Sequence, residues 1–271
     1  MPELPEVETT RRGISPWLTG QKIQSVRVRQ PSLRWPVPAE IADCLRGARV
    51  SSVKRRSKYL LIEVGEGTAL VHLGMSGSLR LSDPAESYRK HDHWWWTLEN
   101  GKQLRYHDPR RFGALLWMPS SQAGHPLLQS LGPEPLESEF TGAYLWQQSR
   151  ARKVAIKNFI MDSRVVVGVG NIYASESLFR AGIHPLRAAG RVSLQRYQGL
   201  ADAIRQVLGE SIESGGSTLR DYVNSSGAPG YFQQQLGVYG RQGQPCPACG
   251  EAVRSVRIGQ RSSFYCPRCQ R

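Results

Sequence analysis

The 271-residue sequence predicts an α+β protein with two domains, and three observations lead to this class. An amphipathic segment at the start is followed by short β segments separated by Gly and Pro turns, the pattern of a β-sandwich or barrel. The hydrophobic period then becomes helical. Two Cys-x-x-Cys pairs follow, around a hairpin pattern. We therefore expect an N-terminal helix and β-sandwich, then a helical domain that ends in a metal-bound hairpin.

The first half supplies the helix and the strands of the sandwich. Ahead of Gly20, four apolar residues share one helical face, namely Leu4, Val7, Ile14 and Leu18. Asn100-Gly101 separates two β segments and is a strong signal for a tight hairpin turn. The expected strands cover residues 23–29, 59–64, 69–73, 78–81, 93–98, 102–107 and 114–117.

The second half is predicted to be helical. Residues 131–136 contain one Gly and two Pro and mark a linker. Helices are expected at residues 144–149, 154–161, 172–179 and 193–214. The last is the clearest, because apolar residues recur along one face from Leu194 to Ile212 and Gly215-Gly216 ends it. The expected domains are residues 1–131, 132–236 and 237–271, the last being a zinc finger.

The composition favours a polyanionic partner. Lys and Arg number 36 against 22 Asp and Glu, which gives a net charge of +14, and the pI is near 10.0. Two clusters are poor in acids, residues 46–58 and residues 241–271, and we interpret them as a binding surface. The sequence has no membrane-length apolar run, signal peptide pattern, basic amphipathic helix or lipidation site. We expect a cytosolic protein whose partner is nucleic acid rather than membrane.

The four cysteines of the C-terminal segment have the spacing of a zinc site. Sixteen residues separate the two pairs, Cys246/Cys249 and Cys266/Cys269. Disulfides or redox motifs are the alternative, but the reducing cytosol and the absence of a βαβ pattern argue against both. Four thiolates fill the coordination of one Zn²⁺, so the ion would be structural. It would hold a hairpin of residues 253–258 and 263–265, with Arg261 near its apex.

The start of the chain permits two interpretations. Removal of Met1 would expose Pro2 as a secondary amine beside Glu3. Such an amine can attack a carbonyl carbon, and the iminium that forms stays positively charged and accepts electrons. Alternatively, Pro2 and Pro5 begin a helix whose positive end is favoured by acidic residues. These few residues alone favour the second interpretation.

A glycine-rich turn precedes the third predicted helix. Gly168-Val-Gly-Asn171 is a weak nucleotide-binding signal, since a third glycine and a strand–helix unit are lacking. It is either a tight turn or a phosphate-binding helix N-terminus that includes the Asn171 side chain, and the sequence supports both equally.

Six motifs spread over the whole chain carry a resemblance. They are PELPE at residues 2–6, RRSKYL at 55–60, HLGMSG at 72–77, DPRRFG at 108–113, GVGNIY at 168–173, and Gln260-Arg261. Together they resemble the formamidopyrimidine-DNA glycosylase family. The resemblance implies a β-sandwich domain followed by a helix–two-turn–helix domain with a zinc finger, and DNA as the partner.

The resemblance also assigns chemical roles. It implies that Pro2 attacks C1′ of the damaged nucleotide, expels the oxidised base and forms the iminium. Glu3 would be the acid/base partner, and Lys58 would contact DNA and assist proton transfer. Arg261, at a phosphate-binding position beside the lesion, would complete the catalytic set. β- and δ-elimination would then cut both sides of the lesion, on a nucleotide turned out of the stack.

Further residues match positions that contact DNA in the family. Met75, Arg110 and Phe112 would fill the vacated space in the duplex, as thioether, hydrogen-bonding fork and aromatic wedge. Without the resemblance, core packing would be expected for Met75 and Phe112. His91, Arg110 and Arg152 match DNA contacts, although family members carry Lys or another basic residue at the position of Arg152.

Two residues and one loop complete the set that the resemblance implies. Lys157 and Asn171 match phosphate-binding positions. Residues 225–232, rich in Gly and Ser, correspond to the loop that closes over the extruded base.

The expected partner is duplex DNA with oxidised purines or abasic sites, bound by a bacterial, nucleoid-associated monomer that holds one structural Zn²⁺. One alternative is a glycosylase of the endonuclease VIII type, which prefers oxidised pyrimidines. The other is a non-catalytic zinc-finger DNA-binding protein, which would have no use for a secondary amine beside Glu3.

Overall fold

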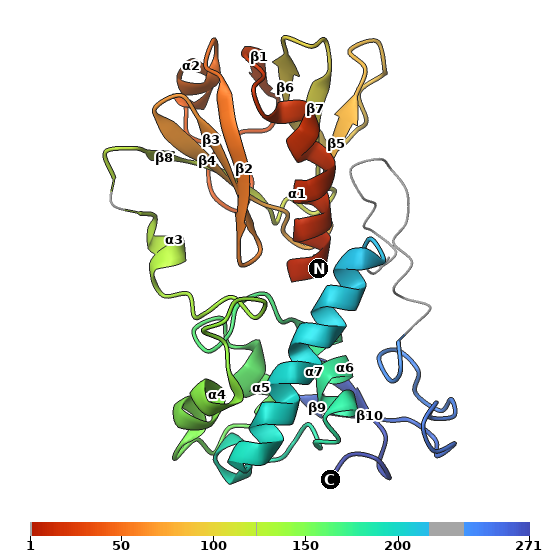
Figure 1. The fold of residues 1–271 in the computed structure, drawn as a ribbon. Coiled ribbons are helices and arrows are strands. Elements are labelled where there is room, and N and C mark those ends of the chain that lie inside the picture. Colours follow the sequence, from red (N-terminus) through yellow and green to blue (C-terminus); the bar gives the residue numbers. More distant parts are fainter. Residues whose placement is uncertain (1, 123, 217–235) are drawn as a thin grey trace. The chain divides into compact units, whose positions relative to one another are not determined.

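The computed structural model describes residues 2–122, 124–216 and 236–271 and divides them into two compact units (Figure 1). The first unit contains the described residues up to 129 together with residues 214–216. The second contains residues 130–213 and 236–271, so the zinc finger groups with the helices. The three domain boundaries given above stay predictions. Among the described residues, no helix combines the length and apolarity that a membrane crossing needs.

The first unit is a sandwich of two antiparallel four-stranded sheets, which confirms the sandwich over the barrel. The first helix is α1 (Leu4–Leu18), and two short helices, α2 (Ile41–Leu45) and α3 (Pro126–Gln129), were not predicted. One sheet has the order β1 (Ile23–Val28), β6 (Asp92–Leu98), β7 (Gln103–His107) and β5 (Ser78–Ser82). The other has the order β2 (Val50–Arg56), β3 (Tyr59–Val64), β4 (Gly67–His72) and β8 (Ala114–Pro119).

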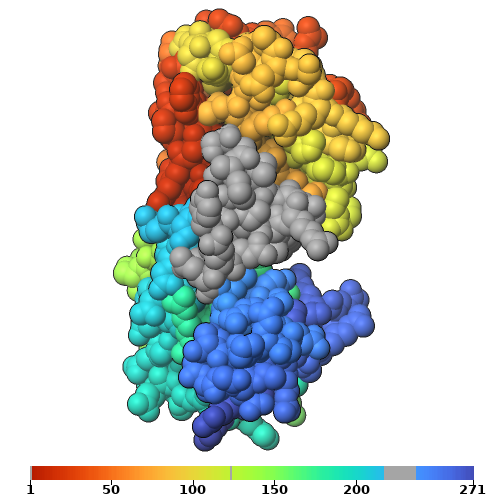
Figure 2. Space-filling view, turned by 90° about the vertical axis from the view of Figure 1, so that its right-hand side faces the viewer, coloured from red at the N-terminus to blue at the C-terminus, as the bar shows by residue number. Residues whose placement is uncertain are grey.

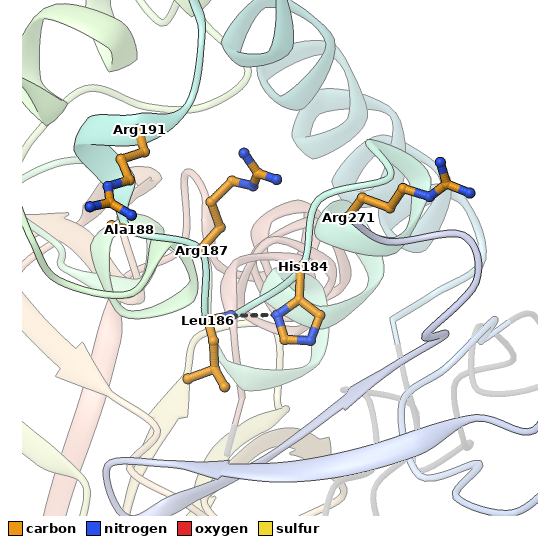
Figure 3. Close-up of a pocket in the computed structure, with 6 residues that line it drawn as sticks. All are labelled: His184, Leu186, Arg187, Ala188, Arg191 and Arg271. Carbon is orange, nitrogen blue, oxygen red and sulfur yellow. Dashed lines mark hydrogen bonds between the residues drawn. The ribbon is translucent and has the colours of Figure 1, made fainter.

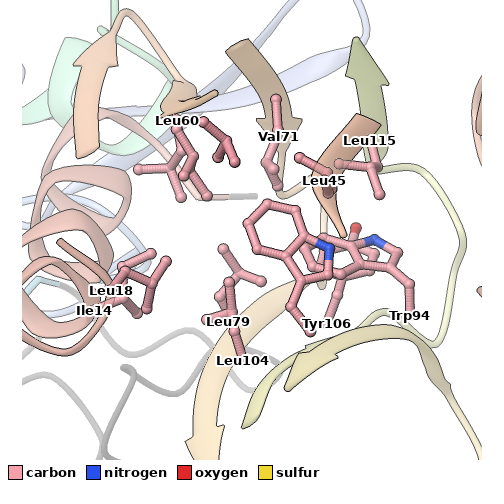
Figure 4. Packing of buried hydrophobic residues seen from close by; sticks show 14 of the residues in the cluster. Ile14, Leu18, Leu45, Leu60, Val71, Leu79, Trp94, Leu104, Tyr106 and Leu115 are labelled. Atoms are coloured by element: carbon pink, nitrogen blue, oxygen red, sulfur yellow. The ribbon is translucent and has the colours of Figure 1, made fainter. Parts of the chain in front are cut away.

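The core of the first unit lies between the two sheets and under α1 (Figure 4). One sheet contributes Trp94 and Tyr106, whose rings stack at 5.2 Å between centroids. The other contributes apolar residues such as Leu60, while α1 adds Leu18 and α2 adds Leu45. All of these side chains are buried, so apolar burial stabilises this unit without a metal.

Strand β2 was missed because its sequence does not alternate. Its two buried valines, Val50 and Val53, are three residues apart, which does not fit the two-residue repeat of a strand. An irregularity in the pairing with β3 between Val50 and Ser52 accommodates this spacing. The remaining residues are polar or basic. They belong to the basic cluster at 46–58, and at least four of the six basic residues of this cluster form ion pairs within the unit rather than being left for a partner.

The second unit is built around α7 (Leu194–Glu213), which packs against α4 (Gly142–Ser149) and α6 (Asn171–Arg180). Helix α5 (Ile156–Met161) packs against α6, and a 3₁₀ turn covers Ala189–Arg191. The apolar face predicted for α7 is buried from Tyr197 onwards, whereas Leu194 at its first turn is 40% exposed. The finger hairpin consists of β9 (Arg254–Ile258) and β10 (Arg261–Tyr265), and β10 contacts α6.

Candidate functional site

Strand register brings the loops of the first unit's candidate residues to one end of the sandwich. Tyr59 pairs with His72 and His72 with Ala114, so the β2–β3 turn, the β4–β5 loop and the β7–β8 loop share an end of one sheet. In the other sheet, His107 pairs with both Ser78 and Asp92. The candidates at this end, which we call the loop end, are Lys58, Met75, His91, Arg110 and Phe112.

Helix α1 runs antiparallel to β2, which places Pro2 and Glu3 toward the loop end as well. Arg55 Nε lies 3.2 Å from Glu8 Oε2, and one turn further along the helix Arg11 Nη1 lies 3.4 Å from the carbonyl oxygen of Val53. The start of α1 therefore lies at the same end as the end of β2, where the β2–β3 turn carries Lys58. Figure 1 shows the start of α1 and this turn at the same end of the unit.

Glu3 is the N-cap residue of α1. Its carboxylate accepts a hydrogen bond from the Glu6 backbone N–H, and Glu6 Oε2 accepts from the Glu3 N–H at 2.8 Å. This capping box fixes a carboxylate directly after Pro2, and both residues are buried. The helix-start interpretation of the sequence is thus correct as a description of structure. It does not exclude Pro2 and Glu3 as reactive groups, because the capping contacts also hold the Glu3 carboxylate in a fixed position beside Pro2.

Lys58 lies beside a histidine that stays neutral. Ser57, in the left-handed region at φ 57°, turns the chain between β2 and β3. Burial lowers the pKa of His72 to about 4, and the nearby charges of Lys58 and Arg34 lower it further. The Gly74 N–H donates to His72 Nδ1 at 3.0 Å, so the ring proton is on Nε2. Lysine and arginine charges therefore dominate here, which suits an anionic partner.

Met75 and Phe112 are exposed and are not part of the core. Met75 is 37% exposed and Phe112 is 45% exposed, so the core-packing expectation fails for both. The guanidinium carbon of Arg110 lies 4.9 Å from the centroid of the Phe112 ring. Arg111 has a φ of 56° and turns the chain between them. Each of the two loops thus presents a large apolar side chain to solvent.

Asp108, which begins the DPRRFG motif but was assigned no role from the sequence, joins these two loops. Its carboxylate is buried and accepts from Ser76 Oγ at 2.9 Å, in the Met75 loop. It also accepts from Tyr106 Oη and from the N–H groups of Arg110 and Gly113, at 3.0, 3.2 and 2.9 Å. Three of these donors come from the two loops and Tyr106 comes from β7, so one carboxylate ties both loops to the sheet.

Glycines allow the two loop backbones to touch. A Cβ on Gly74, at φ 70°, would lie 2.5 Å from the Gly113 nitrogen. A Cβ on Gly113 would lie 1.7 Å from Tyr106 Oη. No side chain fits at either position, so the spacing of the loops depends on these glycines.

His91 belongs to a group of three histidines at the loop end. Its ring centroid lies 5.8 Å from that of His107 and 6.3 Å from that of His93. His107 Nδ1 is 3.0 Å from Asp92 Oδ1, and Asp92 also forms a buried bidentate pair with Arg80. His91 is half-buried and packs against His107, whose position is fixed by its contact with the buried Asp92–Arg80 pair.

In the second unit, Asn171 and Lys157 are hydrogen-bonded to each other and to the finger. Asn171 is the first residue of α6, after the Gly170 N-cap. Lys157 Nζ donates to Asn171 Oδ1 and to Ser263 Oγ, each at 2.6 Å, and Asn171 Nδ2 donates to the Ser262 carbonyl oxygen at 3.1 Å. Lys157 is only 1% exposed, so its ammonium reaches this network rather than the surface.

Arg261 and Arg152 are both exposed in this unit. Arg261 begins β10 and pairs with Ile258 across the turn, as its predicted place near the apex required. Figure 2 shows the dark-blue hairpin standing out from the surface of the unit. A cleft of about 230 Å³ lies between this turn and α5. Arg152 follows α4, after Ala151 at φ 60°.

The four cysteines of the finger form a cluster whose geometry fits zinc. Their sulfurs all lie within 4.8 Å of one another, with Cys246–Cys269 at 3.9 Å and Cys249–Cys266 at 3.5 Å. A tetrahedron with Zn–S bonds of about 2.3 Å has S–S edges of about 3.8 Å. Within the knuckles, Ala248 N–H donates to Cys246 Sγ, and the Cys269 N–H donates to Cys266 Sγ. One structural Zn²⁺ fits this site.

A second buried acid that the sequence did not reveal attaches the finger to α6. Glu176 accepts from the backbone N–H groups of Gly237, Val238 and Tyr239 at 2.8–3.0 Å. Glu176 accepts from residues distant in the sequence, and Asp108 joins its own loop to the distant Ser76, so no local pattern reveals either role. The predicted lid at residues 225–232 lies outside the described residues.

Comparisons with known proteins agree with this arrangement. Family models match three successive regions: "Formamidopyrimidine-DNA glycosylase N-terminal domain" at residues 1–115, "Formamidopyrimidine-DNA glycosylase H2TH domain" at 131–223, and "Zinc finger found in FPG and IleRS" at 243–271. The formamidopyrimidine-DNA glycosylase of Methylococcus capsulatus is 61% identical over 271 residues, covering all of both chains.

Two solved structures are also similar over nearly the whole chain. The MutM (Fpg) protein of Thermus thermophilus has a TM-score of 0.89 at 40% identity, covering 99% of this chain and 98% of its own. A single-residue mutant of Lactococcus lactis Fpg, in complex with Fapy-dG containing DNA, has a TM-score of 0.93 at 33% identity and full coverage of both chains. With three family models in order along the sequence and a relative of this identity across its whole length, the chain belongs to the formamidopyrimidine-DNA glycosylase family.

Proposed function

We propose that the protein is a DNA glycosylase and AP lyase that removes oxidised purines from duplex DNA and cuts the strand at the resulting site. The observation that carries the proposal is the loop end of the sandwich. There, strand register and the direction of α1 bring together the start of the helix, the Lys58 turn and two loops with exposed apolar side chains. Family membership supports the same reaction.

Pro2 is the proposed nucleophile once Met1 has been removed. An α-amino group has a pKa of about 7.7–8.0, so a useful fraction is uncharged near neutrality. Its nitrogen forms a bond to C1′ while the bond from C1′ to the base breaks, and the base leaves with the electron pair. Loss of the amine proton and opening of the sugar ring give an iminium. This cation accepts the electron pair of the C2′–H bond when that proton is removed. The returning pair forms the C2′–C3′ double bond, and the 3′-phosphate leaves with the electrons of its bond to C3′.

Glu3 and Lys58 are proposed to move protons in these steps. Glu3 protonates the ring oxygen of the sugar as the ring opens, and the capping box holds its carboxylate beside the attacking nitrogen. Lys58 contacts the DNA and assists proton transfer during elimination. Both side chains lie toward the loop end, as the mechanism requires.

Met75, Arg110 and Phe112 are proposed to occupy the space left by the extruded nucleotide. Unstacking a base costs a few kcal/mol, and apolar side chains inserted into the duplex offset that cost. The exposure of Met75 and Phe112, and the stacking of Arg110 on the Phe112 ring, support this role. His91 and Arg152 are proposed as further DNA contacts.

In the second unit we propose that Asn171 and Arg261 bind phosphates beside the lesion. Lys157 serves this site through Asn171, because its buried ammonium is hydrogen-bonded to the Asn171 side-chain oxygen. That contact fixes the orientation of the Asn171 amide, whose nitrogen donates one N–H to the Ser262 carbonyl oxygen and keeps a second N–H for a phosphate. The zinc ion holds the hairpin that carries Arg261 and takes no part in the chemistry.

The remaining expectations are also proposals. The domains are taken as residues 1–131, 132–236 and 237–271, and the lid as residues 225–232. We also propose that the protein acts as a monomer in the bacterial cytoplasm and associates with the nucleoid through its binding to DNA.

Borohydride trapping on a duplex containing 8-oxoguanine tests the nucleophile. We expect a covalent adduct that maps to Pro2, and no adduct when a tag precedes Pro2, because the amine is then an amide. An adduct on a lysine would contradict the assignment. A parallel duplex with thymine glycol distinguishes the oxidised-pyrimidine alternative, which predicts stronger trapping on that lesion.

Glu3→Gln separates chemistry from helix capping. The amide oxygen still accepts the Glu6 N–H, so α1 and DNA binding should persist while base removal nearly stops. Unimpaired turnover by this variant would leave Glu3 with only its capping role.

A further inference from the structure

An open pocket of about 570 Å³ lies in the second unit, and none of the residues that line it has a role assigned above (Figure 3). Its volume is within the range of small-molecule sites. The residues that line it are His184, Leu186, Arg187, Ala188, Arg191 and Arg271.

The three guanidinium groups of this pocket have no acceptor in the part of the protein that the structure describes. Across those residues, the side chains of Arg187, Arg191 and Arg271 form no hydrogen bond and no ion pair. Neighbouring arginines do: Arg180 pairs with Glu210, and Arg196 donates to the carbonyl oxygens of Gly182 and Arg271. No Asp or Glu occurs in residues 177–201. In Figure 3, Arg187 stands between Arg191 and Arg271.

The backbone that carries these arginines is fixed. The Ile156 N–H donates to the Arg187 carbonyl oxygen at 2.7 Å, and the Gly190 N–H donates to the Arg152 carbonyl oxygen at 2.8 Å. Residues 187–190 therefore form a ribbon with residues 152–156. The pocket adjoins the segment that carries Arg152, and its positive charge is held in place by a structured element rather than by a free loop.

His184 adds a hydrogen-bond donor to the pocket. Its Nδ1 accepts from the Leu186 N–H at 3.3 Å, so its ring proton is on Nε2. The ring packs edge-on against Tyr265 of β10 at 4.5 Å between centroids. Burial, together with the charge of Arg187, lowers the pKa of His184, so the ring enters the pocket uncharged near neutrality.

We propose that this pocket binds phosphate groups, with the unpaired forks of Arg187 and Arg191 as the main ligands. A guanidinium matches a phosphate through two parallel N–H donors, which a neutral or cationic ligand cannot use. The phosphates come either from a nucleic-acid backbone or from a free phosphorylated ligand. Binding of a nucleic-acid backbone in this pocket rests on the DNA-binding role proposed above, whereas binding of a free phosphorylated ligand does not.

The test uses the full-length zinc-loaded protein and the variant Arg187→Gln/Arg191→Gln. Within the described ranges, neither side chain makes a polar contact that the change would remove from the fold. The control is Lys22→Gln/Lys102→Gln, which lowers the net charge equally at the end of the sandwich opposite the loop end. Calorimetry with tripolyphosphate reports free phosphate binding, and a salt series with a long undamaged duplex reports backbone binding.

We expect tripolyphosphate to bind the wild type and the control alike, and to bind the Gln variant about tenfold or more weakly, since two charge-assisted contacts are lost. Arg187→Lys/Arg191→Lys should recover only part of the affinity, because the forks are gone. If backbone phosphates occupy the pocket, the slope of log K against log salt also falls by about 1.8, at about 0.9 for each contact. An unchanged slope with weakened tripolyphosphate binding assigns the pocket to a free ligand.

Equal binding of both probes by the wild type and the Gln variant would overturn the proposal. Trapping at Pro2 is measured separately on each protein, so a failure of the glycosylase assignment is distinguishable from a failure of the pocket.

Discussion

The β-sandwich and the zinc-finger hairpin both present exposed residues from turns, but different forces hold those turns in place. The sandwich has an extensive apolar core between two sheets and α1. The buried core of the finger, among the described residues, consists of Val238, Cys246, Val253 and Cys266. The difference shows that buried polar groups have different structural roles in the two regions. In the sandwich they shape loops on a scaffold that is already stable, whereas in the finger they attach a metal-dependent element to helices.

The positions of the buried charges agree with this contrast. Asp108 and Asp92 are bound by partners from the sandwich itself. Glu176 and Lys157 belong to the helices α6 and α5, and they bind the finger from outside. Loss of a polar group should therefore disturb shape in the sandwich and attachment in the finger.

The largest expected effect is the loss of zinc. Cys266→Ser should release the metal and unfold the finger, because structural zinc contributes on the order of 10 kcal/mol to small zinc modules. DNA affinity should fall while the thermal transition of the sandwich stays at its wild-type temperature. Zinc content, calorimetry and DNA binding measure these three outcomes. A finger that stays folded without metal would remove the contrast between the two regions.

Breaking the Arg80–Asp92 pair should give the largest loss of stability within the sandwich. Asp92→Asn leaves Arg80 buried without its partner carboxylate, which should cost about 3–5 kcal/mol of unfolding free energy. Asp43→Asn is the control: its exposed pair with Arg46, at 3.6 Å, should be worth about 1 kcal/mol or less. Denaturant unfolding of both variants provides the comparison.

The same pair predicts the response to acid. Burial alone would raise the pKa of Asp92, but hydrogen bonds from His107, Arg80 and the Arg89 N–H hold it well below the ordinary value. A carboxyl whose folded pKa is depressed contributes stability above its unfolded pKa of about 3.9 and loses it as the pH falls toward the folded value. The stability gap between wild type and Asp92→Asn should thus be constant near neutrality and narrow below about pH 4. A gap that widened in acid would contradict this account.

Asp108→Asn should have a smaller effect on stability and a selective effect on lesion recognition. The asparagine amide keeps one acceptor oxygen but places its NH₂ group against N–H and O–H groups that need an acceptor. We therefore expect the free energy of unfolding to fall by about 1–3 kcal/mol. Affinity for lesion duplex should fall because both loops are released. Phe112→Ala is the matched variant: it removes the exposed ring, should weaken lesion binding, and should leave the unfolding transition unchanged. If Asp108→Asn kept wild-type lesion affinity, the loops would not depend on this carboxylate.

The smallest expected effect is the loss of one phosphate contact at the finger. Arg261→Ala should keep the zinc and reduce the slope of log K against log salt by about 0.9. Arg254→Ala, at the other end of the hairpin from the turn, should leave the slope unchanged. Full affinity and an unchanged slope in Arg261→Ala would make the finger a structural appendage.

Local signals predicted much of this fold. Helices α1 and α7, the Asn100-Gly101 turn and the zinc hairpin all follow from periodicity or from turn and ligand spacing within a few residues. Strand β2 escaped because a bulge breaks its alternation and basic residues fill the rest. Helix α2, with five residues, is too short to show a period.

The four-cysteine cluster was predictable because its spacing carries the chemistry, and the structure confirms it. Pro2 could be favoured as the nucleophile only through the family motif, and its role stays a prediction. The site was not predictable where burial decides the role. The resemblance suggested a phosphate position for Lys157, but only the structure places its ammonium against Asn171 and Ser263. Asp108 accepts from a residue 32 positions away and Glu176 from one 62 positions away, so no local spacing reveals them.

The contact between Gly74 and Gly113 has a consequence for how recognition can change over evolution. These glycines, with Asp108, fix where the two loops stand, while Met75 and Phe112 project from them into solvent. The scaffold is therefore intolerant of substitution and the projecting side chains are tolerant, although each projecting residue adjoins its glycine in the sequence. If Met75 and Phe112 fill the gap in the duplex as proposed, substitutions there would change the contacts to DNA without refolding the loops. Contact and support could then change independently of each other.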